Sequence, residues 1–269
     1  MTTGDTVFSG SIPALYDRFM GPMLFKPYAE DLTRRLADLK GGRVLETAAG
    51  TGIVTEALVA GLPSAVEIVA TDLNQAMVDF AATKSGILRA RLQQADALSL
   101  PFEAGSVDVV VCQFGVMFFP DRVAGYREAK RVLKPGGRLL FNAWDSLAHN
   151  PLPALLNEAL AARFPADPPR FFERTPHGYH DVERIRADLA AAGFGDISLD
   201  TVTLPSRSAS ARDAATGFCQ GSPLRGEIEA RAPGGLQATT DAVAAALAQR
   251  YGSGEIEAAM QAHVVTARA

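Results

Sequence analysis

The sequence contains little cysteine and no long apolar run. Its two cysteines, Cys112 and Cys219, are too few for a disulfide framework, and neither stands at a metal-ligand spacing. The most apolar stretches, such as residues 107–112, are far shorter than a membrane span. The first ten residues lack the basic and apolar regions of a signal peptide. We therefore expect a cytoplasmic protein without a metal or a membrane partner.

A basic surplus is also absent. The formal net charge is −4, whereas chains built mainly to hold nucleic acid usually carry an excess of lysine and arginine. The 269 residues include 48% hydrophobic and 21% charged residues, which is the composition of an ordinary globular protein. We expect one domain that binds no nucleic acid, and the sequence leaves its oligomeric state open.

From residue 43 to residue 144 short apolar strands alternate with helical segments. Strands separated by helices imply right-handed crossovers and therefore a parallel, doubly wound α/β sheet. Ligands of such sheets bind beyond the carboxyl ends of the strands, so functional residues are expected there. The predicted strands are residues 43–47, 66–71, 88–95, 107–112 and 138–143.

The second half of the chain is less regular. A helical pattern at residues 181–191 is followed by strand patterns at residues 197–204 and 260–267. A further helix is predicted from Asp241 to Tyr251, behind the cap candidates Thr239 and Thr240. We interpret the chain as one domain, residues 1–269, with three parts: an N-terminal cap segment at 1–40, a cofactor-binding core at 41–145 and a helical cap insertion at 205–255.

The strongest local signal is the run from Val44 to Gly52, VLETAAGTG, which leaves a strand and opens a helix. Gly50 and Gly52 remove side chains where the backbone must approach a ligand, and the next helix offers unpaired N–H groups. A turn that binds pyrophosphate would have its glycines at other positions, and the carboxylate of Glu46 would repel the pyrophosphate. The same carboxylate would complement the ammonium group of S-adenosylmethionine (SAM).

Three further features follow the ends of successive predicted strands. Asp72 lies twenty residues past Gly52, where a carboxylate can accept both hydroxyls of a ribose. Asp96 ends the third strand, within reach of an adenine amino group. Each of these features alone also fits a structural role, but their shared position at strand ends favours a SAM site. Four side chains after the fourth strand could line it: Phe114, Met117, Phe118 and Phe119.

On these residues, the stretch from Val44 to Ala143 resembles the SAM-binding domain of class I methyltransferases, close to the ubiquinone/menaquinone-biosynthesis type. The run from Cys112 to Asp121 is similar to a bacterial branch with small-molecule substrates, and the resemblance continues through residues 176–181 and 257–268. It implies a Rossmann-like fold: a seven-stranded, mostly parallel sheet with an antiparallel last strand, plus a helical cap. It also implies direct in-line methyl transfer from SAM to an oxygen, carbon or nitrogen of a small organic molecule.

The resemblance further implies which residues contact SAM. The usual first glycine of the family motif is Ala48 here, and we expect slightly altered contact provided that φ of Ala48 is negative. An amphipathic stretch before the first strand would close over SAM through Tyr16. The expected cofactor-binding residues are Tyr16, Glu46, Ala48, Gly50, Gly52, Asp72, Leu73, Met77, Asp96, Ala97, Gln113 and Phe114.

The acceptor is less well defined. Candidate general bases are His149, His177 and His180, because histidine is suited to proton transfer near neutrality, and His177 is favoured among them. Histidine in a loop is otherwise often a surface or hydrogen-bonding residue. Trp144 is interpreted as a pocket wall. A partly hydrophobic acceptor is suggested by apolar residues of the cap: Phe171, Phe172, Phe218 and Leu224.

Two other functions fit parts of the pattern. A protein of this fold could bind SAM in a regulatory role, or for other chemistry, without methyl transfer, because fold does not fix function. An NAD-dependent dehydrogenase is disfavoured by Glu46, by Asp96 and by the spacing of the glycine-rich turn.

Overall fold

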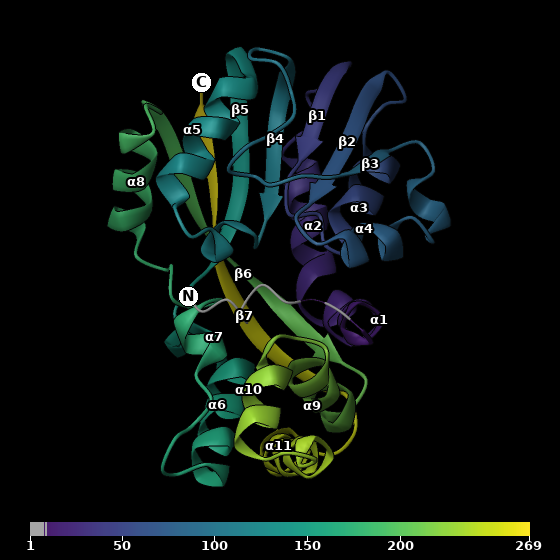
Figure 1. Ribbon diagram of the computed structural model, residues 1–269, viewed down its shortest axis with the longest axis vertical. Coiled ribbons are helices and arrows are strands. Elements are labelled where there is room, and N and C mark those ends of the chain that lie inside the picture. The colour runs from purple at the N-terminus through teal and green to yellow at the C-terminus, as the bar shows by residue number, and fades with distance from the viewer. Residues whose placement is uncertain (1–7, 9) are drawn as a thin grey trace.

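A seven-stranded sheet forms the upper part of the protein in Figure 1, with the strand order β3-β2-β1-β4-β5-β7-β6. The computed structural model describes Phe8 and residues 10–269. Strand β7 pairs antiparallel with β5 and β6, and the strands from β3 to β5 pair in parallel. The predicted fold class is therefore confirmed. The strands are β1 (Gly42–Glu46), β2 (Val66–Asp72), β3 (Arg91–Gln94), β4 (Val107–Gln113), β5 (Leu133–Trp144), β6 (Asp196–Ser208) and β7 (Ile256–Arg268).

The centre of the sheet is made by β1 and β4. The β-branched residues Val109, Val110 and Val111 are each no more than 1% exposed, as expected for a strand covered on both faces. The strand order reverses between these two strands, because β1 is followed by β2 on one side and β4 is followed by β5 on the other. A parallel sheet opens a crevice at such a point, at the carboxyl ends of its strands.

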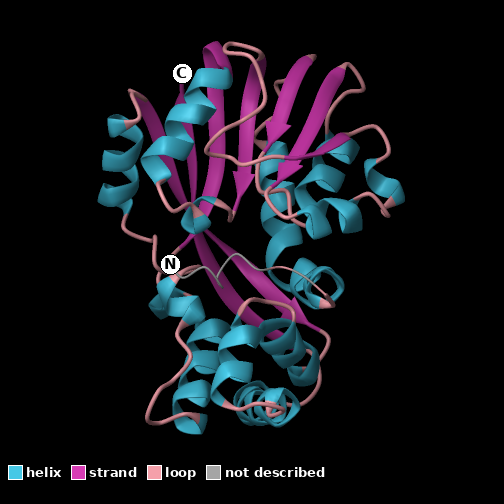
Figure 2. Cartoon of the chain, in the orientation of Figure 1, coloured by secondary structure: helices cyan, strands magenta, loops and turns pink. Residues whose placement is uncertain are grey.

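Helices cover both faces of the sheet (Figure 2). Helix α5 passes in front of the sheet in Figure 1 and α2 lies behind it. Two helices begin at acidic N-caps: Asp121 accepts from the backbone N–H of Ala124, and Asp181 accepts from those of Glu183 and Arg184. The helices of this part are α2 (Lys26–Arg34), α3 (Ile53–Gly61), α4 (Gln75–Ala81), α5 (Arg122–Val132) and α8 (Val182–Ala191).

A second group of helices forms the lower body of Figure 1, into which β6 and β7 extend. This helical cap is larger than predicted, because α6 and α7 precede the expected insertion and pack with it. Helix α11 begins at Leu236, directly after Gly234 and Gly235, so Thr239 and Thr240 lie inside the helix and the predicted start at Asp241 is wrong. The cap helices are α6 (Pro151–Arg163), α7 (Phe171–Arg174), α9 (Ala211–Gln220), α10 (Leu224–Arg231) and α11 (Leu236–Tyr251).

The first described helical residues, 12–25, lie between the sheet and the cap in Figure 1. Helix α1 (Ile12–Leu15) continues into a π-helical segment, Tyr16–Phe25, and then into α2. The hydroxyl of Tyr28 donates to the carbonyl oxygens of Val202 and Met260, at 2.8 and 3.1 Å, and fastens this segment to β6 and β7. Residues 1–7 and 9 of the predicted cap segment lie outside the described residues. Within the described part of the chain, every helix is too short or too polar to cross a bilayer.

Candidate functional site

The carboxyl end of β1 carries a buried acid. Glu46 is 1% exposed, and its Oε2 accepts a hydrogen bond of 2.6 Å from Thr55 Oγ1. Burial raises the pKa of Glu46 to about 8, and the nearby carboxyl group of Asp72 adds to the rise. At neutral pH this side chain is therefore mostly protonated, and a cation placed beside it would favour the ionised form.

The turn after β1 is held by a second acid at the end of β2. Asp72 is 7% exposed and accepts two backbone hydrogen bonds of 2.8 Å, from Gly50 N–H and from Asn74 N–H. These bonds lower the pKa of its carboxyl group, but burial has the larger effect and raises it. The carboxylate of Asp72 thus links the turn after β1 to the turn after β2, and it also lines the cavity at these turns.

Two residues with side chains adopt left-handed backbone conformations at this edge. Phe114 has φ of 49° and Ala48 has φ of 53°, so the expectation of a negative φ at Ala48 is wrong. Such a conformation costs a residue with a Cβ roughly 1–2 kcal/mol. Gly115 makes the room, because a Cβ at Gly115 would lie 2.5 Å from the Cβ of Ala48. Strain of this kind tends to persist at binding sites, where the surrounding structure holds it.

A first cavity of about 770 Å³, its open mouth included, lies at these strand ends. A smaller recess of about 270 Å³ adjoins it and is lined by Glu46. Gly52 lines neither space. Glycine suits this position for another reason: its φ is 82°, and a Cβ there would lie 3.2 Å from the Cβ of Ala81. The first cavity is lined by ten of the twelve expected cofactor residues: Tyr16, Ala48, Gly50, Asp72, Leu73, Met77, Asp96, Ala97, Gln113 and Phe114.

Some side chains differ from expectation. Met117 is 1% exposed and belongs to the hydrophobic core, so the idea that it lines the cofactor site is wrong. Phe8 and Leu98 line the first cavity but were not predicted. Neither stands in a motif: Phe8 precedes all predicted helices and strands, and Leu98 follows Asp96 by two residues. Only the tertiary structure brings them to the site.

A second cavity of about 660 Å³ lies between the sheet and the cap. Its lining is largely aromatic and aliphatic, and Trp144 stacks on Phe114 with ring centroids 3.8 Å apart. Trp144 is therefore a wall of this cavity, as predicted from the sequence. The first and second cavities share four lining residues, all of them aromatic: Phe8, Tyr16, Phe114 and Phe118.

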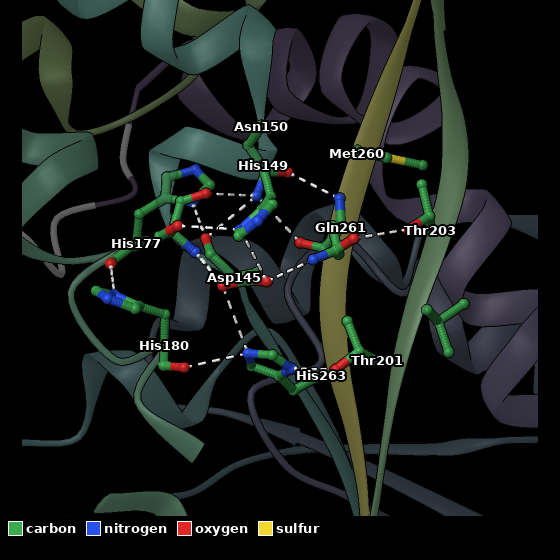
Figure 3. A network of polar contacts seen from close by, with 12 residues as sticks. Asp145, His149, Asn150, His177, His180, Thr201, Thr203, Met260, Gln261 and His263 are labelled. Carbon is green, nitrogen blue, oxygen red and sulfur yellow. Dashed lines mark hydrogen bonds and ion pairs between the residues drawn. The ribbon is translucent and has the colours of Figure 1, made fainter. Parts of the chain in front are cut away.

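All four histidines of the chain gather around Asp145, at the end of β5 (Figure 3). The carboxylate of Asp145 lies 3.2 Å from His149 and 3.5 Å from His263. His180 Nδ1 lies 2.8 Å from the carbonyl oxygen of His177. Of the three candidate bases, only His177 lines the second cavity.

The ring of His177 has a defined orientation. Its Nδ1 donates a 2.6 Å hydrogen bond to the backbone carbonyl oxygen of Asp145, because a carbonyl can only accept. The lone pair of the neutral ring is then on Nε2. Burial lowers the pKa of His177 to about 4, so the ring is neutral at physiological pH. Nε2 of this neutral imidazole, at the wall of an apolar cavity, is therefore the ring atom that can accept a hydrogen bond from a bound molecule.

Comparison with known proteins identifies the family. A family model described as a methyltransferase domain matches residues 45–141. The chain is 30% identical over 212 residues to the ubiquinone/menaquinone biosynthesis C-methyltransferase UbiE of Ectopseudomonas mendocina. The aligned residues cover 73% of this chain and 77% of that protein. It is 44% identical over 100 residues to the demethylmenaquinone methyltransferase of Deinococcus radiodurans, over 36% of this chain and 41% of that enzyme.

A solved structure shows the same fold. The phosphoethanolamine N-methyltransferase 2 of Haemonchus contortus, in complex with SAM, superposes with a TM-score of 0.58 at 17% identity, over 95% of this chain and 56% of that one. The fold and the relatives together define a class I methyltransferase. The chain belongs to the SAM-dependent methyltransferase family, and SAM is its cofactor. This membership sets the dehydrogenase alternative aside, and it does not favour a SAM-binding protein without methyl transfer.

The polar groups of the recess fit the methionine part of SAM. Thr51 Oγ1 and Gln113 Oε1 are buried without a hydrogen-bond partner among the described residues, and both residues line the recess beside Glu46. A hydroxyl can donate to a carboxylate, whereas a carboxylate and an amide oxygen can accept from an ammonium group. Space is available as well, since no atom lies within 4 Å of where a Cβ of Gly50 would stand.

The raised pKa of Glu46 predicts a proton release on cofactor binding. With a pKa of about 8, Glu46 is mostly protonated at pH 7, and the ammonium group of SAM would stabilise its ionised form. Calorimetric titration with SAM at pH 7, in two buffers of different ionisation enthalpy, should therefore report close to one proton released. The variant Glu46→Gln should bind SAM with no such release. An equal proton count in both proteins would show that Glu46 does not meet the ammonium group.

Proposed function

We propose that this enzyme methylates a small, partly hydrophobic aromatic molecule that carries an ionisable hydroxyl group. One observation carries the proposal: the cavity at the strand ends and the apolar cavity under the cap meet at the same four aromatic side chains. A cofactor in the first and an acceptor in the second would lie next to each other. The relatives named for demethylmenaquinone and ubiquinone/menaquinone methylation support an acceptor of the quinol type.

The parts of the chain divide the work. Residues 41–145 would hold SAM, with Asp72 at the ribose, Leu73 and Met77 at the adenosine, Asp96 and Ala97 at the adenine, and Gln113 at its amino group. Residues 1–40, with Tyr16, and the cap insertion at 205–255 would close the site, and α6 and α7 complete the cap. The acidic overall charge supports a small-molecule acceptor and not a nucleic acid.

Bound SAM supplies a methyl group that its sulfonium already activates. The protein has to align the acceptor with that methyl group and exclude water, and such alignment accounts for much of the rate gain in reactions between two molecules. The lining of the second cavity is largely aromatic and aliphatic, which would disfavour water beside the methyl group. His177 would accept the hydroxyl proton at Nε2, which makes the acceptor electron-rich at oxygen and at its ring carbons.

Calorimetry followed by a methylation assay tests this function. The purified protein should bind both SAM and its demethylated product, S-adenosylhomocysteine, with micromolar affinity. Incubated with SAM, it should then transfer a methyl group to 1,4-naphthohydroquinone or 4-phenylphenol, seen by mass spectrometry, and leave phosphoethanolamine unchanged. Failure to bind either form of the cofactor would contradict the assignment of the first cavity. Methylation of phosphoethanolamine in preference to the phenols would overturn the acceptor class.

A further inference from the structure

Ser206 presents an unsatisfied hydroxyl group to the acceptor cavity. This residue of β6 is 1% exposed, lines the second cavity, and has no hydrogen-bond partner for Oγ among the described residues. A buried hydroxyl without a partner is costly, so such groups usually mark a site that a ligand or water completes. Of the buried unpartnered side-chain groups in the described chain, Ser206 is the one that lines this cavity.

The neighbouring serines show that the missing partner is particular to this position. Ser208, two residues on along the same strand, donates to the carbonyl oxygen of Ser210 at 3.0 Å. Ser222, which also lines the cavity, donates to the carbonyl oxygen of Phe218 at 2.6 Å. Asn150 is satisfied too, since its amide bonds the backbone of residues 145, 146 and 261. Ser206 Oγ and His177 Nε2 are therefore two polar atoms of the lining that remain available to a ligand.

The cavity carries no fixed charge. Within the described residues, its lining includes no lysine, arginine, aspartate or glutamate, and His177 is neutral at physiological pH because burial lowers its pKa to about 4. An ionised carboxylate, phosphate or ammonium group in such a place would be desolvated without a counter-charge, which is strongly unfavourable. The group that meets Ser206 is therefore a neutral oxygen or nitrogen.

The pairing register of β6 and β7 indicates how far apart Ser206 and His177 lie along the strands. Asp145, whose carbonyl oxygen holds His177, donates its backbone N–H to Gln261, and Gln261 pairs with Thr203 on β6 (Figure 3). Ser206 lies three residues farther along β6, which corresponds to about 10 Å at the rise of a β-strand. Aromatic rings, among them Phe172 and Phe218, line the cavity along with these two groups.

Building on the proposed function, we propose that the acceptor is a neutral molecule with two polar ends, held by His177 at the hydroxyl that loses its proton and by Ser206 at a distal hydroxyl, ether or carbonyl group. An apolar, aromatic body about two rings long joins the ends. Ser206 is then a specificity-determining residue. It selects neutral oxygenated aromatics and disfavours both plain aryl phenols and molecules with a charged far end.

Three rigid probes that differ only at the far end test the proposal. These are 4,4′-dihydroxybiphenyl, 4-phenylphenol and 4′-hydroxybiphenyl-4-carboxylate, each titrated into the protein saturated with S-adenosylhomocysteine. The wild-type protein should bind the diol about five- to tenfold more tightly than 4-phenylphenol, since a neutral hydrogen bond contributes roughly that factor. The carboxylate should bind most weakly. In Ser206→Ala, the diol and 4-phenylphenol should bind equally.

Ser208→Ala is the matched control, because it removes a paired hydroxyl from the same strand outside the cavity lining. It should keep the wild-type preference for the diol. Equal binding of the diol and 4-phenylphenol by the wild-type protein, a preference that survives in Ser206→Ala, or no binding of any probe would each overturn the role of Ser206. Loss of S-adenosylhomocysteine binding itself would instead contradict the proposed function.

Discussion

Replacing Asp72 with alanine is expected to weaken SAM binding by roughly 100-fold or more. The carboxylate of Asp72 lines the first cavity. Each of two hydrogen bonds from ribose hydroxyls to this charged acceptor would contribute roughly 1.5–3 kcal/mol to binding. The same change frees Gly50 N–H, which Asp72 now fixes at 2.8 Å, so the turn beneath the cofactor also loosens. Calorimetric titration with SAM measures the combined loss.

Two further variants separate cofactor contact from damage to the fold. Asp72→Asn keeps an oxygen that can accept from a backbone N–H but lacks the charge, and it should lose less affinity than Asp72→Ala. Asp79→Ala removes an exposed carboxylate of α4 that bonds Gln75 and lines neither cavity, so its SAM affinity should equal that of the wild type. A folded Asp72→Ala protein with unchanged SAM affinity would refute the ribose contact.

The central strands could be predicted closely because they are buried on both faces. Residues 66–71 and 107–112 were expected as strands, and β2 and β4 extend each by one residue. Strand β3 is at the sheet edge, where burial gives little pattern, and it covers only Arg91–Gln94 of the predicted residues 88–95. Helix α6 was not predicted, although Pro151 at its start is a position where proline is well tolerated.

The candidate site could be predicted where it depends on local chain geometry. Asp72 is the last residue of its strand, so its place at the carboxyl edge of the sheet comes from the alternation of strand and helix alone. The left-handed conformation of Ala48 could not be predicted, because it depends on the space that the distant Gly115 leaves. Ser206 stands in a polar strand, and nothing in the pattern of that strand indicates that its hydroxyl is buried. Contacts between distant segments decide all such features.

Replacing His177 with asparagine is expected to lower kcat about 100-fold or more and to leave SAM affinity unchanged. Asparagine keeps a donor near the position of Nδ1 for the carbonyl oxygen of Asp145, but it offers no base in place of Nε2. The measurement uses whichever phenol or quinol the wild-type enzyme methylates fastest. His149→Asn is the control, since His149 contacts Asp145 but lines neither cavity. A rate for His177→Asn within a few-fold of the wild type would remove His177 as the base.

The pH dependence of stability gives this variant a second readout. Histidine has a pKa of about 6.5 in an unfolded chain and burial lowers that of His177 to about 4, so between these values the unfolded state binds a proton that the native state does not. The contribution of neutral His177 to stability is full above pH 6.5 and falls by on the order of 3 kcal/mol as the pH drops to 4. Denaturant titrations of His177→Asn should show a shallower loss over this range. An unchanged slope would mean that the folded enzyme does not lower the pKa of His177 and that its ring is open to solvent, which would contradict its place in an enclosed, apolar acceptor cavity.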